Sequence, residues 1–323
     1  MKKILATCAM TLLATPALAQ DHMTVMLDWF INPDHGPIIL AEELGFFADA
    51  GLEVELVTPA DPSDPPRMVA AGNVDLALSY QPELHLNRRE GLDVVRVGTL
   101  IETPLTCLVV RADGPVQSVA DLAGRKVGFS VAGVQEMLLS AMLAHSGLSP
   151  EDVEQINIGW SISPALMSGQ VDGVIGAFRN FELNQMQLEG HEGRCFYPEA
   201  EGVPAYDELI YIARAEGLDR ELISRFLLAT ERAAAYIVND PEAAGKAFFA
   251  TSAELRNELN IRAWADTWPR FASRPAAVDQ GRYARFEAFL LAQGAVEAAI
   301  PAADLVRDVT ADITADATAD VAQ

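Results

Sequence analysis

The chain has 323 residues, with 46 acidic against 23 basic side chains and a formal net charge of −23. Such a surface repels nucleic acid and anionic lipid headgroups, which excludes partners of those classes. An anionic solute would have to be held by a local site, because the overall field does not attract it. The length is sufficient for two lobes, each with a core of its own.

The first 19 residues have the pattern of a signal peptide. Two lysines precede an apolar core at 4–13, and Ala17-Leu18-Ala19 is a small-x-small cleavage site. The core is too short to span a bilayer, and no later segment is apolar enough, so we expect no stable membrane insertion. We disfavour a lipid anchor at Cys8, because the apolar core before it would be far too short. The expected product is a mature periplasmic chain that starts near Gln20.

Strands and helices are expected to alternate from the start of the mature chain. Apolar runs bounded by glycine and proline predict strands at 24–29, 52–57, 74–80, 93–100, 105–111, 126–130, 155–160, 171–177 and 208–213. Helices are expected at 37–44, 66–71, 82–90, 133–145, 163–167 and 181–188, and almost continuously after 219. Strands separated by short helices are typical of mostly parallel sheets flanked by helices.

The alternation of strands and helices breaks near 105–115, and the chain is expected to return to the first lobe near 204–212. This predicts two α/β lobes joined by two crossings and a hinge. We assign 1–19 to the signal peptide, 20–110 and 209–303 to lobe 1 with C-terminal helices, 111–208 to lobe 2, and 304–323 to a polar tail. In open α/β sheets, ligands bind beyond the carboxyl ends of the strands. Two such edges facing each other would form a binding cleft.

Only Cys107 and Cys195 remain after cleavage of the signal peptide. The two could pair in an oxidising compartment. We favour two separate buried thiols, because Cys107 falls in a lobe crossover and Cys195 near the end of a lobe. The chain has no CxxC, no HExxH and no histidine cluster, so no metal site is expected.

The stretch LDWFINPDHG, residues 27–36, gathers recognition chemistry at the end of the first strand. Trp29 and, in the same lobe, Tyr80 both lie at carboxyl ends of strands, so a planar ligand could stack against them. Asn32 and His35 follow in the turn and offer donors and acceptors to a heterocycle, and a neutral imidazole is favoured at a helix N-terminus. Each of these residues could instead cap the core or the turn. Asp28 could bind the ligand or backbone amides.

In the second lobe, the segment around Phe178, Asn180 and Glu182 also follows an apolar strand. Glu182 could accept two hydrogen bonds from an amino-heterocycle, or could simply cap a helix. The turn at 130–133 precedes a helix, so its backbone amides could hold an anion or polar group. Trp160 could form a cleft wall or part of the lobe interface.

Catalysis has little support in the sequence. None of the five histidines has the spacing of a nucleophile pair, and no GxSxG, P-loop or GxGxxG is present. We therefore expect no catalytic residue, no cofactor and no enzymatic activity.

Three further segments carry a family resemblance together with the LDWFINPDHG stretch. They are Ala41-Glu42-Glu43-Leu44-Gly45-Phe46-Phe47, Asp75-Leu76-Ala77-Leu78-Ser79-Tyr80-Gln81 and Arg179-Asn180-Phe181-Glu182. The chain resembles substrate-binding proteins related to the pyrimidine synthase of thiamine biosynthesis, and in particular the binding component of ABC importers for thiamine pyrimidine precursors. The likeness covers roughly residues 24–240.

The resemblance implies a type II periplasmic binding protein fold and a monomer that delivers an aminopyrimidine to an ABC permease. It also implies that Trp29 and Tyr80 stack on the pyrimidine. Its edge would be bound by Asn32, His35, Asn180 and Glu182.

Two other functions remain open. A pyrimidine synthase-like enzyme is one, although the chain lacks the cysteine-rich stretch of the synthase and has no lysine near the first-lobe site. The other is a binder of the same fold for nitrate, an alkanesulfonate, taurine or another aromatic solute. An anion site should show basic residues at the cleft, and the candidates are Arg111, Arg125 and Arg179.

Overall fold

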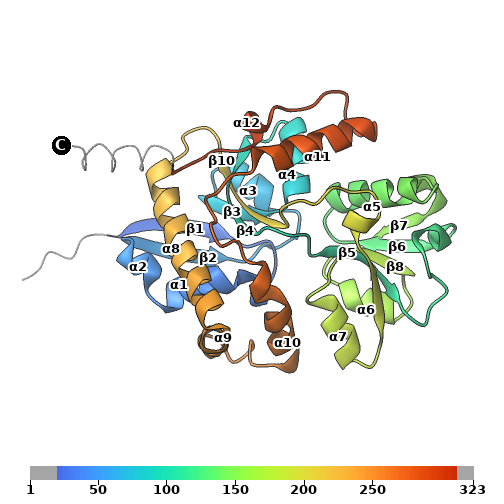
Figure 1. Cartoon of the computed structure of the whole chain (residues 1–323), viewed down its shortest axis with the longest axis horizontal. Coiled ribbons are helices and arrows are strands. Elements are labelled where there is room, and N and C mark those ends of the chain that lie inside the picture. The colour runs from blue at the N-terminus through green and yellow to red at the C-terminus, as the bar shows by residue number, and fades with distance from the viewer. Residues whose placement is uncertain (1–19, 311–323) are drawn as a thin grey trace, which may run out of the picture.

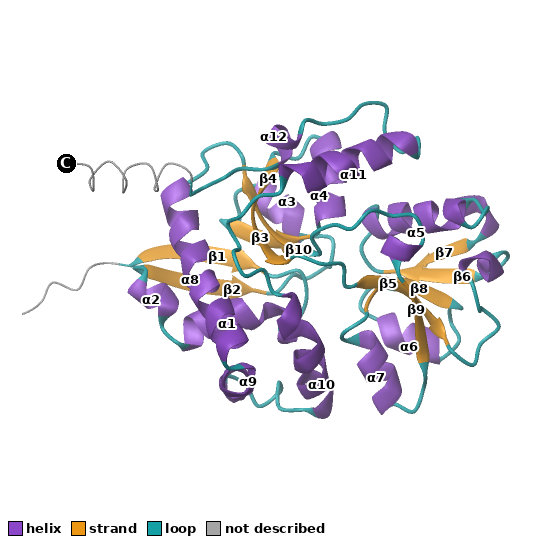
Figure 2. Cartoon of the chain, viewed as in Figure 1, coloured by secondary structure: helices purple, strands orange, loops and turns teal. Residues whose placement is uncertain are grey.

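Two α/β lobes lie side by side in the computed structural model, which describes residues 20–310 (Figure 1). Each lobe is built on a five-stranded sheet, with the order β2-β1-β3-β10-β4 in the first and β7-β6-β8-β5-β9 in the second. Helices cover both faces of the sheets (Figure 2). The expected two-lobed architecture is confirmed.

The first sheet places the ends of β1 and β3 at one edge. Its strands are β1 (Asp21–Met26), β2 (Leu52–Val57), β3 (Leu76–Ser79), β4 (Val94–Ile101) and β10 (Leu209–Arg214). Strand β1 pairs in parallel with β2 and β3, whereas β10 is antiparallel to its neighbours β3 and β4. The turns that follow β1 and β3 therefore emerge next to each other.

The second sheet has the same plan. Its strands are β5 (Thr106–Arg111), β6 (Lys126–Phe129), β7 (Glu154–Asn157), β8 (Gly173–Phe178) and β9 (Gly193–Phe196). Here β6 is parallel to β7 and β8, and β5 is antiparallel to β8 and β9. In each sheet the strand of opposite direction is thus the one that comes directly after a crossing between the lobes.

Local sequence explains where the helices begin and end. Lobe 1 contains α1 (Gly36–Glu43), α2 (Phe46–Asp49), α3 (Pro65–Ala70) and α4 (Gln81–Arg89), and lobe 2 contains α5 (Val134–His145), α6 (Ile162–Met167) and α7 (Glu182–Leu188). Prolines stand in the first turns of α1, α3 and α4, where the missing N–H costs nothing. Gly45, with φ of 73°, separates α1 from α2.

The C-terminal region returns to lobe 1 as a series of helices. These are α8 (Arg220–Asn239), α9 (Pro241–Ala250), α10 (Glu258–Thr267), α11 (Gln280–Ala292) and α12 (Ala302–Leu305). The long helix α8 is capped by the side chain of Asp219, which accepts from the N–H of Leu222. Its apolar face packs on α1 and α2, so it belongs to the first-lobe core.

Two of the expected boundaries are wrong. Strand β5 pairs within the second sheet, so the first crossing lies at 102–105 and lobe 2 begins before residue 111. The segment 304–310 is not a polar tail, because Leu305, Val306 and Val309 are buried and the N–H of Arg307 donates to the carbonyl of Arg96. Three apolar side chains in an acidic, alanine-rich segment gave too weak a signal. The signal peptide at 1–19 and the rest of the tail lie outside the described residues.

Cys107 and Cys195 form a disulfide, so the expectation of two separate thiols is wrong. The reason is strand β9, which the sequence pattern did not reveal. It places Cys195 opposite Val109 on the strand that contains Cys107. The cross-link therefore ties an edge strand to the crossing strand of lobe 2.

Removing this disulfide should destabilise the protein. We expect the double variant Cys107→Ala, Cys195→Ala to lose about 2–4 kcal/mol of unfolding free energy, because the cross-link constrains a long unfolded loop. Urea denaturation monitored by circular dichroism measures the loss. Wild-type protein in reductant is the control and should unfold near the midpoint of the variant; equal midpoints for the variant and the oxidised wild type would contradict the expectation.

Candidate functional site

A cavity lies between the two lobes. Its lining comes from the carboxyl ends of strands in both sheets, as expected for open α/β folds. Lobe 1 contributes Asp28, Trp29, Asn32, Asp34 and Tyr80, and lobe 2 contributes Val131, Gln135, Ile162, Gly176, Phe178, Phe181 and Glu182. Among these described residues there are three carboxylates and no lysine or arginine. The cavity therefore suits a small ligand that donates hydrogen bonds.

The turn after β1 builds most of the first-lobe wall. Asn32 caps the short helix η1 (Pro33–His35): its side-chain oxygen accepts from the N–H of Asp34 at 2.7 Å, and its amide nitrogen donates to the carbonyl of Phe30 at 3.1 Å. The N–H of Asn32 donates to Nδ1 of His35 at 3.2 Å. Asn32 thus lines the cavity, but the two polar atoms of its side chain are engaged in holding the turn.

His35 is fully buried and lies behind Asp28 rather than in the lining of the cavity. Because Nδ1 accepts a hydrogen bond, the ring proton is on Nε2, which donates to Oδ1 of Asp28 at 3.0 Å. The hydroxyl of Tyr80 donates to Oδ2 of the same carboxylate at 2.9 Å. His35 and Tyr80 therefore fix Asp28 from two sides, and this network joins the turn after β1 to the end of β3.

Glu182 begins α7 and forms the acidic end of the second-lobe wall. Its Oε2 accepts from the N–H of Phe178, the last residue of β8, at 2.6 Å. Burial, together with the nearby charge of Asp34 and against hydrogen bonds from the backbone, raises the pKa of Glu182 from its usual 4.5 to about 8. In the empty cavity this carboxyl group is therefore protonated at neutral pH.

Asp34 connects the two lobes. The side-chain amide of Asn180, from the turn between β8 and α7, donates to Oδ1 of Asp34 at 2.6 Å. The same amide lies 2.6 Å from the hydroxyl of Thr267 on α10. Burial raises the pKa of Asp34 to about 6, against the hydrogen bonds from Asn180 and Thr267. Asn180 does not line the cavity and instead holds the lobes in contact beside it.

Aromatic side chains form the rest of the site. The ring of Tyr80 faces that of Phe178 edge to face at 6.4 Å across the cleft. Trp160 does not line the cavity and instead packs against Trp29 at 4.3 Å and Phe30 at 4.6 Å, so first-lobe and second-lobe aromatics meet beside Trp29. A planar ligand in the cavity would contact Trp29, Tyr80 and Phe178.

The sequence analysis did not identify Gln135 and Gly176. Oε1 of Gln135 accepts from the N–H groups of Ser130 and Val131 at 2.7 and 3.1 Å, and Glu136 accepts from the N–H of Gly133. The backbone amides of this turn are therefore occupied, and the anion site considered there is not available.

Gly176 has φ of 93°, and a β-carbon there would lie 2.1 Å from the Gln135 amide nitrogen.

The three candidate arginines for an anion site are paired elsewhere. Arg179 forms an ion pair with Glu199 at 2.6 Å and donates to the carbonyls of Leu105 and Thr106. Arg111 lies 3.4 Å from Asp113 and Arg125 lies 3.3 Å from Asp172. None of the three contributes to the cavity lining.

Residues 20–310 contain no cluster of three or more histidine, cysteine or acidic side chains with the geometry to hold a metal ion. Within the same range, no helix has the length and apolar character needed to cross a bilayer.

The pKa of Glu182 predicts a pH-dependent stability. Between its unfolded pKa near 4.5 and its folded pKa near 8, the folded state holds the proton more tightly, so stability falls as pH rises through this window. We expect ligand-free Glu182→Gln to lose less stability over this range than the wild type, as measured by urea denaturation at stepped pH. The exposed Glu189, at the end of the same helix, gives the control Glu189→Gln, which should follow the wild type. Parallel stability profiles for Glu182→Gln and wild type would contradict the assignment.

Known proteins similar to this chain indicate its family. A family model described as NMT1/THI5 like matches residues 32–244. A Haemophilus influenzae protein, whose name provisionally assigns it to thiamine biosynthesis, is 48% identical over 89% of this chain and 92% of its own length. The formylaminopyrimidine-binding protein of Halalkalibacterium halodurans is 35% identical over 74% of this chain and 73% of its own.

Two further similarities concern the alternatives. A 4-amino-5-hydroxymethyl-2-methylpyrimidine phosphate synthase of Legionella pneumophila is 27% identical over 82% of this chain and 86% of its own length. The solved structure of the alkanesulfonate-binding protein SsuA from Xanthomonas axonopodis superposes with a TM-score of 0.70 at 18% identity, covering 91% of this chain and 99% of that one. This last similarity shows a periplasmic binding protein fold. The chain belongs to the NMT1/THI5-like family.

Proposed function

We propose that this protein binds a small aminopyrimidine precursor of thiamine, such as its hydroxymethyl or formylaminomethyl form, and delivers it to an ABC permease. The observation that carries the proposal is the interlobe cavity, in which buried carboxyl groups and aromatic rings face each other without a lysine or arginine. Like most small-molecule sites, the cavity combines apolar and aromatic walls with a few polar groups. The name of the 35% identical relative points to the same ligand class.

An aminopyrimidine is complementary both to the aromatic rings and to the carboxyl groups of the cavity. Its flat ring offers faces to Trp29, Tyr80 and Phe178, and aromatic contacts of this kind contribute about 0.5–1.5 kcal/mol beyond area burial. Its ring nitrogen and exocyclic amine form an adjacent acceptor and donor. The protonated carboxyl of Glu182 presents the complementary donor and acceptor, and transfer of the proton to the ring gives a charge-assisted pair of about 1.5–3 kcal/mol.

The residues for ligand contact are therefore Trp29, Tyr80, Phe178 and Glu182, with Asn32 at the edge of the cavity. His35, Asn180 and Trp160, which the sequence analysis placed in the ligand site, act one layer further out. His35 orients Asp28, Asn180 holds the lobes together, and Trp160 packs over Trp29. Asp28 and Asp34 join the contact set.

An anion such as nitrate or an alkanesulfonate fits this cavity poorly. It would face the carboxylates of Asp28 and Asp34 with no lysine or arginine in the lining to balance their charge. A second candidate, a pyrimidine synthase-like enzyme, is favoured by the 27% identical relative. We prefer binding without turnover, because the lining contains no lysine, cysteine or serine to serve as a nucleophile.

We further propose that the protein acts in the periplasm as a monomer. The pattern of the first 19 residues is that of an export signal. The disulfide between Cys107 and Cys195 is typical of an oxidising compartment.

Titration with two pyrimidines tests the function. We expect 4-amino-5-hydroxymethyl-2-methylpyrimidine or its formylaminomethyl analogue to quench tryptophan fluorescence and raise the melting temperature. Ligand at 100 times its Kd should add about 2.7 kcal/mol to stability. Trp29→Ala and Glu182→Gln should both weaken binding by tenfold or more, about 1.4 kcal/mol.

Glu189→Gln is the matched control and should bind as the wild type does. Taurine and nitrate are the control solutes and should leave fluorescence and melting temperature unchanged. A response to either anion without a response to the pyrimidines would overturn the proposal. Consumption of the pyrimidine or appearance of a new product by mass spectrometry would instead favour the enzyme.

A further inference from the structure

Two chain segments join the lobes, and they run side by side (Figure 1). The first, residues 102–105, links β4 to β5, and the second, residues 201–208, leads back to β10. Any opening of the interlobe cavity has to bend both segments. The hydrogen bonds and ion pairs that hold these segments therefore influence how far the lobes separate.

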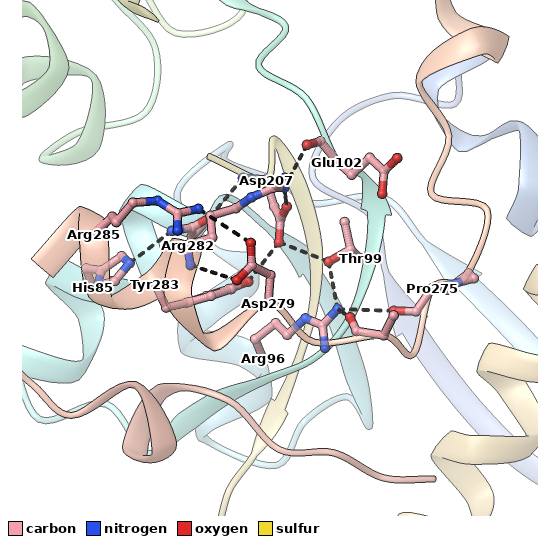
Figure 3. A network of polar contacts seen from close by, with 12 residues as sticks. His85, Arg96, Thr99, Glu102, Asp207, Pro275, Asp279, Arg282, Tyr283 and Arg285 are labelled. Atoms are coloured by element: carbon pink, nitrogen blue, oxygen red, sulfur yellow. Dashed lines mark hydrogen bonds and ion pairs between the residues drawn. The ribbon is translucent and has the colours of Figure 1, made fainter. Parts of the chain in front are cut away.

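Asp207, in the second crossing, is anchored to lobe 1 (Figure 3). Its Oδ2 accepts from the hydroxyl of Thr99 on β4 and from that of Tyr283 on α11, each at 3.1 Å. Its N–H donates to the side chain of Gln81 at 2.9 Å. The guanidinium of Arg96, itself fixed by the carbonyl of Pro275, donates to Thr99 and orients the hydroxyl.

Glu208, the next residue, is anchored to the start of lobe 2. Its carboxylate accepts from the N–H of Leu105 at 2.5 Å, and from the N–H and hydroxyl of Thr106 at 2.8 Å each. Two consecutive carboxylates thus bind different lobes. Asp207 binds side chains of lobe 1, and Glu208 binds the first residue of β5 in lobe 2. We refer to the peptide between Asp207 and Glu208, which lies between the anchors to the two lobes, as the pivot.

Arg282 on α11 connects the two crossings on the first-lobe side. Its Nη1 donates to the carbonyl of Glu102 at 2.8 Å and to Oδ1 of Asp207. Asp207 is 8% exposed and Arg282 26% exposed as side chains, so this ion pair is largely shielded from water. Without the guanidinium, a buried carboxylate would lose its counter-charge and the first crossing would lose its tie to α11.

We propose that Arg282 is a positioning residue for lobe closure, whose guanidinium holds both crossings at the pivot and so favours the closed, ligand-retaining arrangement. The part of this inference that concerns ligand retention rests on the proposed function. Arg282 is remote from the cavity lining, so its effect on binding acts through the population of the closed state. Apparent affinity falls in proportion to that population.

Measurement without ligand tests the pivot directly. Spin labels on Glu55→Cys and Asp113→Cys, whose native side chains are 62% and 82% exposed, report the distance between the lobes by pulsed electron paramagnetic resonance. We expect Arg282→Gln to broaden this distribution and extend it to longer distances. Arg285→Gln on the same helix is the control, because Arg285 is 64% exposed and, among residues 20–310, forms its ion pair with Asp279, so its distribution should match the wild type.

Arg282→Lys is the second variant and retains the charge in a single ammonium group. It should give a distribution between those of wild type and Arg282→Gln, and it keeps the test decisive if Arg282→Gln does not fold. Distributions for both Arg282 variants that superimpose on the wild type, even with lowered melting temperatures, would overturn the proposal and leave Arg282 a purely structural residue.

Stopped-flow tryptophan fluorescence with 4-amino-5-hydroxymethyl-2-methylpyrimidine tests retention. We expect Arg282→Gln to accelerate dissociation about tenfold while association changes far less, as is usual when affinity changes through the off-rate. An unchanged dissociation rate would overturn the retention part. If the wild type binds no pyrimidine, the proposed function fails, whereas the ligand-free distances still decide the role of Arg282.

Discussion

The buried carboxylate of Asp28 is the constraint on which the first-lobe half of the site depends. It is 3% exposed, and each of its oxygens accepts a hydrogen bond, one from His35 and one from Tyr80. A buried carboxylate without such partners would be strongly destabilising. These two hydrogen bonds form only if the turn after β1 and the end of β3 keep a fixed relative position. The same relative position puts Trp29 and Tyr80 on one wall of the cavity. The cavity is preorganised by this requirement before any ligand enters.

Electrostatics in the cavity follow from the same burial. Three carboxyl groups line the cavity, and burial raises the pKa values of Asp34 and Glu182, with no lysine or arginine in the lining to lower them. The protein as a whole carries a charge of −23, so its long-range field adds to the local selection against anions. A neutral base that can take up a proton inside the site is the solute that gains most from such an environment.

Sequence reasoning located much of the fold and part of the site. Parallel strands with ends at a common edge placed Trp29 and Tyr80 together, and the helix start after β8 identified Glu182. It could not show that His35 turns inward to Asp28, because a turn has no periodicity that fixes side-chain direction. Nor could it place Asn180 against Asp34, which are 146 positions apart and belong to different lobes. Strand β9 was missed because its four half-buried residues carry no clear alternation.

The contact between Trp29 and Trp160 gives the protein an internal optical signal. Their ring centroids are 4.3 Å apart and their planes are inclined by 59°. Indoles this close couple as an exciton pair and produce a bisignate band in the far-ultraviolet circular dichroism. Because Trp29 belongs to one lobe and Trp160 to the other, the band exists only while the lobes are in contact. Circular dichroism of the unlabelled protein therefore reports the closed state.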